Sequence, residues 1–309
     1  MRDFMEKFKK YFKCCTFYIM ISELLCKKQN LQLLALGRLL SNQQYCLNSN
    51  NINDYEFKVY SQRGEDGIIQ FLIKNLKITN QTFIEFGVEN YLESNTRFLL
   101  MNNNWSGYVI DGSNDYIRSL QKRPWYWMFD LQSKCAFIDK DNINSLMDGS
   151  GFTDLGILSI DLDGNDFWIF DSLDLSRLRP SIIIAEYNAL FGCDRFITVP
   201  YNKFYNRTRA HYTNLYFGAS LPAINHVADK KGYSLVCCCE AGTNAFFVRN
   251  DLLNNKITKQ FVSSAFIQEK SRQGRDKDYK LSLNNLDERL KLIRGLEVIN
   301  IKTMLPELI

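Results

Sequence analysis

Between residues 55 and 250, short apolar runs alternate with segments of helical pattern, and this alternation restricts the fold more than any other feature of the sequence. The runs that we expect to be strands are residues 82–88, 107–111, 125–130, 155–161 and 181–188. They are apolar nearly throughout, as strands covered by helices on both faces must be. Alternating strands and helices of this length predict a parallel, doubly wound α/β sheet with right-handed crossovers.

The last part of this region adds a hairpin to the parallel strands. A helix expected over residues 218–231 ends at Gly232, a residue that favours helix termination, and strands are expected over 233–239 and 243–249. The three residues between these strands are too few for a crossover, so the last strand must run antiparallel. This order differs from the plain dinucleotide-binding arrangement. It matches the Rossmann-like, mostly parallel seven-stranded sheet of class I methyltransferases.

The sequence divides into three parts. Residues 1–55 are expected to form a helical N-terminal extension, and residues 56–250 the Rossmann-like domain. Residues 251–309 are expected to be a C-terminal appendage, with a helix over 286–293 and a strand over 296–301.

The net charge of +4 is concentrated at the start of the 309-residue chain. Residues 1–30 hold seven Lys and Arg against three Asp and Glu, whereas the remaining basic and acidic residues balance at 31 each. Because the body of the protein has no basic surplus, we expect no nucleic-acid partner. The uncharged stretch 14–22 is too short to span a bilayer, and we expect a cytoplasmic protein. The basic N-terminus either packs on the domain as a helix or contacts anionic lipid peripherally.

The nine cysteines show no spacing typical of a zinc site. Cys237, Cys238 and Cys239 fall on a predicted strand, where neighbouring side chains point to opposite faces and do not converge on one metal ion. We expect buried free thiols, which fit a reducing compartment.

Polar residues stand at the carboxyl end of every predicted parallel strand, where open parallel sheets bind their ligands. The set is Glu85 with Gly87, Asp111, Asp130, Asp161 with Asp163, and Glu186 with Asn188. Together they predict one acidic rim, for which a purely structural protein has no need. An acid at the end of the second strand can accept hydrogen bonds from ribose hydroxyls, and Asp130 after the third can meet an adenine amine.

Several segments resemble the FkbM-like family of class I S-adenosylmethionine-dependent methyltransferases. They are residues 60–67 (YSQRGEDG), 83–88 (FIEFGV), 108–113 (YVIDGS) and 158–166 (LSIDLDGND), while 186–188, 216–220 and 243–247 are similar to a bacterial subgroup near that family. The resemblance covers about residues 55–250. It implies binding of S-adenosylmethionine by Gln62, Glu85, Gly87, Asp111, Ser113 and Asp130, and it places Asp161 toward the transferred methyl group. The implied acceptor is a hydroxyl of a glycan or of another small molecule.

The first loop departs from the pattern of the family, because Glu89 and Asn90 stand where further glycines are usual. A larger, charged loop narrows the pocket or repels a ligand carboxylate. The alternative function is therefore a noncatalytic ligand-binding or scaffolding module on the same fold.

The catalytic candidates are Asp161, Asp163, Glu186, Asn188 and His211. His211 lies in a polar insert after the fifth strand, where a histidine can remove a proton from an acceptor hydroxyl. An ordinary surface histidine is the other interpretation. Arg207 and Arg209 in the same insert either hold a phosphate or carboxylate of the substrate or are simply solvated.

The segment from Asp161 to Asp166 has spacing like the start of an EF-hand loop. However, Ser172 stands at the twelfth position, where that loop has Glu, and a strand rather than a helix precedes it. A site for a divalent ion between Asp161, Asp163 and Glu186 is favoured over an EF-hand, because ligand sets of oxygen atoms alone suit magnesium or calcium. The sequence leaves open whether such an ion is used.

Overall fold

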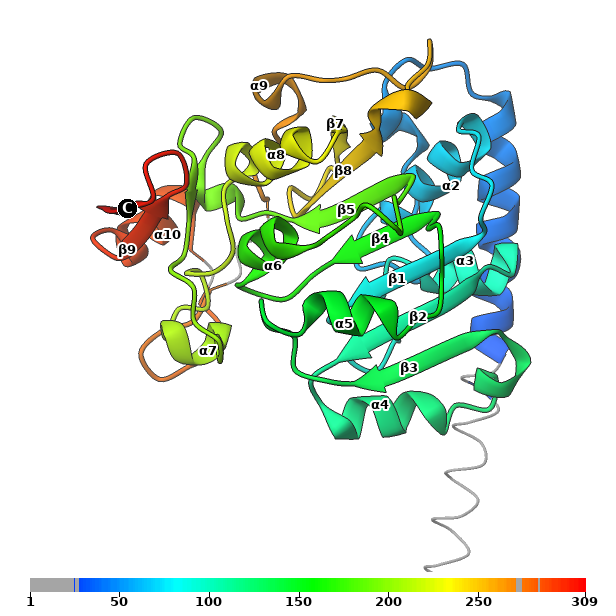
Figure 1. Cartoon of the computed structure of the whole chain (residues 1–309), viewed down its shortest axis with the longest axis horizontal. Helices are drawn as coiled ribbons and strands as arrows, with labels where there is room; N and C mark the ends of the chain where they lie inside the picture. The colour runs from blue at the N-terminus through cyan, green and yellow to red at the C-terminus, as the bar shows by residue number, and fades with distance from the viewer. Residues whose placement is uncertain (1–24, 26–27, 271–273, 283) are drawn as a thin grey trace, which may run out of the picture.

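The computed structural model describes residue 25 and residues 28–270, 274–282 and 284–309. The centre of the molecule is a seven-stranded sheet in the order β3-β2-β1-β4-β5-β8-β7 (Figure 1). The strands are β1 (Thr82–Phe86), β2 (Ser106–Asp111), β3 (Leu131–Cys135), β4 (Ile157–Ile160), β5 (Ile182–Glu186), β7 (Tyr233–Cys238) and β8 (Asn244–Arg249). β8 is antiparallel to both its neighbours, and the other adjacent pairs are parallel. This confirms the predicted Rossmann-like sheet of class I methyltransferase type.

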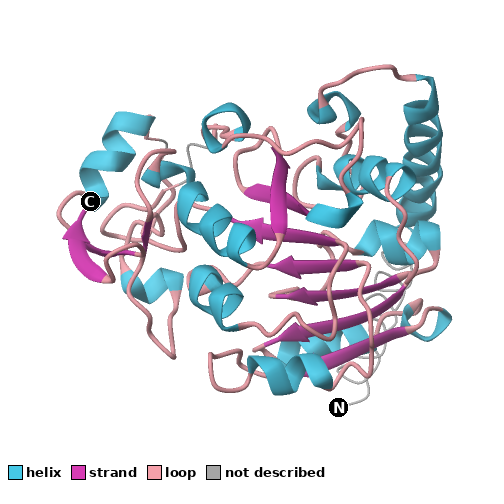
Figure 2. Ribbon diagram, turned by 45° about the horizontal axis from the view of Figure 1, so that its top comes forward, coloured by secondary structure: helices cyan, strands magenta, loops and turns pink. Residues whose placement is uncertain are grey.

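Helices cover both faces of the sheet (Figure 2). One buried cluster combines α5 (Ile143–Asp148), α6 (Asp166–Ser172) and α8 (Leu221–Lys230) with strand residues such as Ile84. The other combines α2 (Glu65–Asn75) and α3 (Arg97–Asn103) with residues such as Phe83. Two further helices are α4 (Asn114–Gln121), which packs beside β3, and α9 (Val262–Ala265), which packs beside β7. The central strands are apolar on both sides because successive residues enter different clusters.

Three adjacent cysteines are buried and free, as expected: Cys237 and Cys238 at the end of β7, and Cys239 directly after it. Cys238 belongs to one buried cluster, whereas Cys237 and Cys239 belong to the other. They therefore diverge to opposite faces of the sheet.

The prediction of a third strand over residues 125–130 is wrong. Tyr126–Met128 form a 3-10 helix, and β3 begins only at Leu131. The aromatic run packs outside the sheet: Trp125 lies on Phe129, with ring centroids 6.2 Å apart. β3 is an edge strand with mostly exposed or half-buried residues, so it lacks the apolar run that identifies the central strands.

A second, antiparallel sheet joins β6 (Ile197–Thr198), β9 (Glu297–Asn300) and β10 (Leu305–Leu308). The predicted C-terminal helix is confirmed as α10 (Leu286–Ile293), which begins with a capping box between Asn285 and Glu288. Val298 of β9 and Ile293 of α10 are buried together with Ile197 of β6. The segment expected as an appendage therefore shares a sheet and a core with residues that follow β5.

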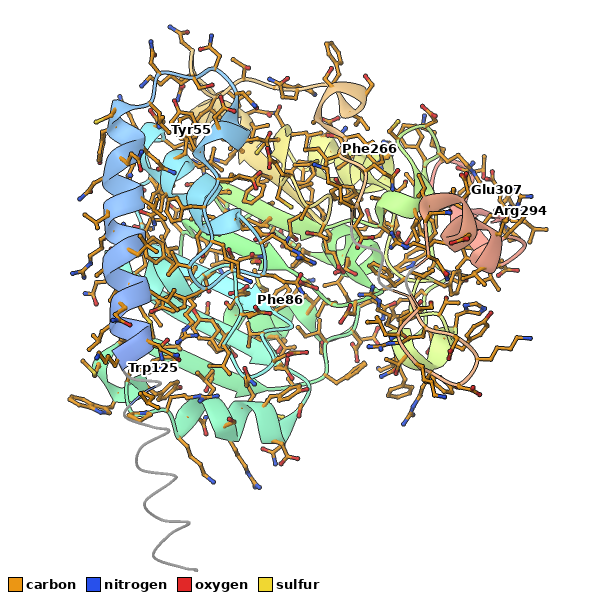
Figure 3. All side chains as sticks on the ribbon, turned by 180° about the vertical axis from the view of Figure 1, so that it is seen from behind. Tyr55, Phe86, Trp125, Phe266, Arg294 and Glu307 are labelled. Carbon is orange, nitrogen blue, oxygen red and sulfur yellow. The ribbon has the colours of Figure 1, made fainter. Side chains whose placement is uncertain are left out.

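Residues 28–43 form a helix along one side of the domain, which we call the N-terminal helix (Figure 3). It is followed by the 3-10 helices Gln44–Cys46 and Ile52–Tyr55. The remainder of the predicted helical extension, residues 1–24 and 26–27, lies outside the described residues. Within the described part of the chain, no helix combines the length and the apolar character needed to cross a bilayer.

One face of the N-terminal helix packs against the domain. Leu34 joins a buried cluster beside α3. A Cβ at Gly37 would lie 2.6 Å from the ring of Phe98, so the helix approaches α3 closely at this glycine. One turn further on, the Ser41 hydroxyl donates a hydrogen bond to Gln70 (3.0 Å). These positions recur at helical spacing, and they leave the opposite face outside the core.

Candidate functional site

Three carboxylates converge at the carboxyl ends of the neighbouring strands β4 and β5. Asp161 directly follows β4, Asp163 lies two residues later, and Glu186 is the last residue of β5. One oxygen of each lies within 4.8 Å of the others. The adjacent parallel strands thus bring three of the predicted catalytic candidates together. We call these three residues the carboxylate cluster.

Arg207, the first residue of α7 (Arg207–Ala210), closes one side of the carboxylate cluster. Its Nη1 lies 2.6 Å from Oδ1 of Asp163. Its Nε donates to the carbonyl oxygen of Asn214 (2.7 Å), and its guanidinium lies 3.6 Å from the centroid of the Phe217 ring. The sequence left open whether Arg207 holds an anionic group of the substrate or is solvated, and in the structure it is ion-paired within the protein.

Burial and mutual repulsion raise the proton affinity of Asp161 and Glu186 in the carboxylate cluster. Burial, followed by the charges of Asp163 and Asp166, raises the pKa of Asp161 well above its usual range. Burial, followed by the charges of Asp161 and Asp163, does the same to the pKa of Glu186. At Arg207 burial lowers the pKa, but the charges of Glu186 and Asp163 outweigh it and the pKa is raised. The cluster therefore favours a bound proton or a further cation beside Arg207.

Glu186 contributes a buried oxygen, Oε2, that has no hydrogen-bond partner among the described residues. Leaving such an oxygen unpaired is costly unless a ligand meets it. Three carboxylates at this spacing offer the hard oxygen ligands that magnesium and calcium prefer. The residues present therefore fit a divalent cation.

Asp166 fixes the loop that carries Asp161 and Asp163. Its Oδ1 accepts from the N–H of Leu162 (2.7 Å) and its Oδ2 from the N–H of Gly164 (2.9 Å). Burial raises the pKa of Asp166 to about 6. Both oxygens of Asp166 accept hydrogen bonds from backbone N–H groups, and a strand precedes the loop. This segment therefore differs from an EF-hand loop.

The ends of β1 and β2 form a second half of the site. Gly87 has a φ of +70°, and a Cβ there would lie 1.7 Å from the carbonyl oxygen of Asp161, so only glycine permits this approach of β1 to β4. Asp111, the last residue of β2, accepts hydrogen bonds from the N–H groups of Glu89 (2.8 Å) and Ser113 (2.7 Å), one on each oxygen. Each carboxylate oxygen has two acceptor positions, so Asp111 retains capacity for a hydroxyl donor.

Glu89 connects the two halves of the site. It adopts a left-handed conformation, with a φ of +48°. Burial, followed by the charges of Asp111 and Asp163, raises its pKa, so its carboxylate is repelled by an acid of each half. This concentration of negative charge favours a positively charged ligand.

Two predicted site residues hold protein segments instead of facing a ligand. Glu85 is 3% exposed, and its carboxylate accepts hydrogen bonds from the backbone and hydroxyl groups of residues 94–96. Asn188 is 1% exposed and donates to the carbonyl oxygens of Leu215 and Phe217 (3.0 Å each). Both residues position loops at the edge of the site.

Asp130 lies at the wrong edge of the sheet for its predicted role. Its expected position at the carboxyl end of a strand depended on the strand over 125–130. In the structure it precedes β3, and its carbonyl oxygen accepts from the N–H of Gly107 at the amino end of β2. The geometric basis for an adenine contact by Asp130 is therefore lost.

The remaining candidates lie around the site without a direct contact to the carboxylate cluster. Ser113 is the N-cap of α4, where its hydroxyl accepts from the N–H of Tyr116. Gln62 is exposed, and its backbone carbonyl oxygen accepts a hydrogen bond from Lys58 Nζ (2.9 Å). His211 follows α7, its Nδ1 lies 2.7 Å from the Thr213 hydroxyl, and burial lowers its pKa.

Sequence reasoning missed the structural roles of two buried acids, Asp66 and Asp166. Oδ2 of Asp66 accepts from the N–H groups of Val59, Tyr60 and Ser61 at 2.7–2.9 Å. Asp66 and Asp166 both lie in the first turn of a helix, α2 and α6. An acid in the first helical turn after a polar loop is the signal that identifies such residues.

Comparisons with known proteins give no assignment by sequence. No protein-family profile matches the chain, and no curated protein matches it. Solved structures with a partial likeness include the N-terminal domain of EvdMO1 with SAH bound (9% identity, 61% of this chain and 80% of that one, TM-score 0.38). An O-methyltransferase from Bacillus cereus in complex with SAH is 13% identical, with 71% and 89% coverage and a TM-score of 0.39. The strand order itself therefore defines the fold.

Proposed function

We propose that this protein is a methyltransferase that uses S-adenosylmethionine to methylate a hydroxyl group of a glycan or another small molecule. The observation that carries the proposal is the position of Asp111, Asp161 and Glu186. They stand at the carboxyl ends of β2, β4 and β5 in a sheet of class I methyltransferase order. In such sheets, this edge is where ligands bind.

The residues at this edge fit the charges of S-adenosylmethionine. When bound, that molecule supplies a methyl group on a positively charged sulfur, which an acceptor oxygen takes by direct displacement. Asp111 has free acceptor capacity for ribose hydroxyls, because its two hydrogen bonds from backbone N–H groups occupy one position on each oxygen. The surrounding acids, Glu89 and the carboxylate cluster, favour the positive sulfonium and ammonium groups.

The carboxylate cluster supports removal of the acceptor proton. As the new oxygen–carbon bond forms, the hydroxyl proton must pass to a base, and the raised pKa of Asp161 and of Glu186 makes either a stronger base than an ordinary carboxylate. Arg207 holds Asp163 in place beside them. His211, which is bonded to Thr213, is the further candidate for this step.

The first test is a thermal-shift titration with S-adenosylhomocysteine, with NAD as the control ligand. Binding to the folded state raises the melting temperature with ligand concentration. A dose-dependent rise with S-adenosylhomocysteine alone supports the proposal, and transfer of labelled methyl groups to a panel of hydroxyl compounds then identifies the acceptor class. No shift with S-adenosylhomocysteine overturns the methyltransferase proposal.

We also propose an alternative state of the carboxylate cluster, in which its oxygens bind a divalent cation instead of the acceptor proton. The buried, unpaired Oε2 of Glu186 and the 4.8 Å limit on the cluster favour this. Calorimetric titration of the wild type with magnesium or calcium is compared with titration of Glu186→Gln, which keeps the shape but removes the charge. Loss of the heat of binding in the variant supports the site, whereas equal heats in both proteins contradict it.

A noncatalytic ligand-binding module is the second candidate function. Glu89 favours it, because its carboxylate lies near Asp111 in the half of the site that the cofactor would use. If Glu89 obstructs that half, Glu89→Gly acquires or strengthens S-adenosylhomocysteine binding relative to the wild type. Equal or weaker binding by Glu89→Gly removes the argument for this candidate.

A further inference from the structure

Four leucines of the N-terminal helix are exposed to solvent. The exposed fractions are 60% for Leu31, 40% for Leu33, 50% for Leu36 and 67% for Leu39. We call these four residues the leucine face. Leu25 before them and Tyr45 after them are 54% and 73% exposed. Single exposed apolar residues are ordinary, but four of them within nine residues of one helix mark an interaction surface.

The leucine face does not serve the core of this protein. The helix packs on the domain through Leu34, Gly37 and Ser41, which lie on its other side. Side chains project outward from the helix along the edge of the molecule (Figure 3). The helix therefore carries apolar residues on a side that does not contact the domain.

The charge pattern of this segment identifies the kind of surface that it fits. No Asp or Glu occurs between Glu23 and Asp54, whereas Lys27, Lys28 and Arg38 lie within that interval. Residues 1–30 carry the whole net charge of the chain, +4. Leucines combined with cations and without acids are the composition of helices that lie in an anionic bilayer interface.

We propose that the leucine face docks the protein on the surface of a membrane containing anionic lipids, whose headgroups attract the cations of the N-terminal segment. A second copy of this chain fits less well, because a twofold contact at this face would place the same cations opposite one another. A nucleic acid fits less well, because phosphates and base edges offer nothing to four exposed leucines.

The test is sedimentation of the full chain with vesicles of phosphatidylglycerol and phosphatidylcholine, compared with vesicles of phosphatidylcholine alone. The variant Leu36→Gln/Leu39→Gln shortens the leucine face at exposed positions, so the fold is retained. We expect the wild type to bind the anionic vesicles, less so at high salt, and the variant to bind them at least about tenfold more weakly. Phe261→Gln, at a 79% exposed residue outside the helix, is the matched control and should bind like the wild type.

Thermal melting verifies that all variants are folded. The proposal is overturned if the wild type fails to sediment with anionic vesicles, or if it sediments equally with both kinds of vesicle. It is also overturned if the double variant binds like the wild type, and loss of binding on removal of residues 1–24 would then assign the contact to the basic segment alone. Vesicle binding requires no methyl transfer, so its outcome is independent of the proposed function.

Discussion

Gly87 and Gly151 have almost the same backbone conformation, with φ of +70° and +71°, but different surroundings. At Gly87 a Cβ would lie 1.7 Å from the carbonyl oxygen of Asp161, whereas at Gly151 it would meet no atom within 4 Å. The first glycine is therefore required both by its dihedral angle and by the close approach of two strands, and the second by its dihedral angle alone.

We expect Gly87→Ala to lower the free energy of unfolding by roughly 3–5 kcal/mol, because backbone strain and a steric clash add. Gly151→Ala should cost only about 1–2 kcal/mol, the penalty of the left-handed conformation. Urea denaturation of both variants measures the difference. Equal losses of unfolding free energy would show that the backbone between β1 and β4 shifts to accommodate the added Cβ without a measurable penalty.

Asp111 is the residue on which the proposed cofactor site depends most. Asp111→Ala should weaken S-adenosylhomocysteine binding about 10–100-fold, because loss of a hydrogen bond to a charged group costs about 1.5–3 kcal/mol. Calorimetry measures the affinity, with Asp115→Ala as control, since Asp115 is an exposed acid in the first turn of the following helix. Unchanged affinity in Asp111→Ala would remove this residue from the site.

At the scale of elements, buried acids join loops to the helices that follow them. Asp66 gathers three backbone N–H groups of residues 59–61 before α2, and Asp166 gathers two of residues 162–164 before α6. Both helices therefore begin with a fixed loop, and the second of these loops carries the catalytic candidates Asp161 and Asp163.

The pH dependence of stability tests the role of Asp66. Burial raises its pKa to about 6 in the folded protein, against about 3.9 in the unfolded chain. The folded state thus binds the proton more tightly, so the stabilisation is complete below about pH 4 and is lost as the pH rises through about 6. Asp66→Asn should flatten this part of the unfolding free-energy curve by up to about 3 kcal/mol. An equally steep curve in Asp66→Asn would contradict the assignment.

The element that sequence reasoning placed wrongly also has an explanation at this scale. The run from Trp125 to Phe129 has the aromatic composition of a strand, but it packs beside the sheet. β3 itself is half exposed because it lies at the edge. A search for apolar runs therefore selects the aromatic run as the strand, which places Asp130 at the carboxyl end of the strand instead of before its amino end.

At the scale of the whole molecule, the C-terminal residues complete a core near the candidate site. Val298 is fully buried with residues of β6 and of the segment around Leu215, to which Asn188 is hydrogen-bonded. Val298→Ala should lower the free energy of unfolding by about 1–3 kcal/mol. Leu305→Ala, at a 62% exposed residue of the same sheet, should change it by no more than about 0.5 kcal/mol. Equal effects in denaturant titrations would show that the second sheet is not part of the cooperative fold.

The sequence by itself determined the sheet. The apolar runs of β1, β2, β4 and β5 and the short turn before β8 require a parallel sheet with a terminal hairpin, because covered strands are apolar on both faces and a short turn permits no crossover. It also identified the acids at the strand ends, of which Asp161, Asp163 and Glu186 meet.

Only the tertiary structure decided which polar residues are available to a ligand. Glu85 and Asn188 stand at strand ends like Asp111 and Glu186, but loops distant in sequence occupy their hydrogen-bonding groups. The pairing of Arg207 with Asp163 and the leucine face likewise depend on how segments fold back on the sheet. A local pattern records the type of side chain, whereas its partners are set by chain packing, which no short stretch of sequence contains.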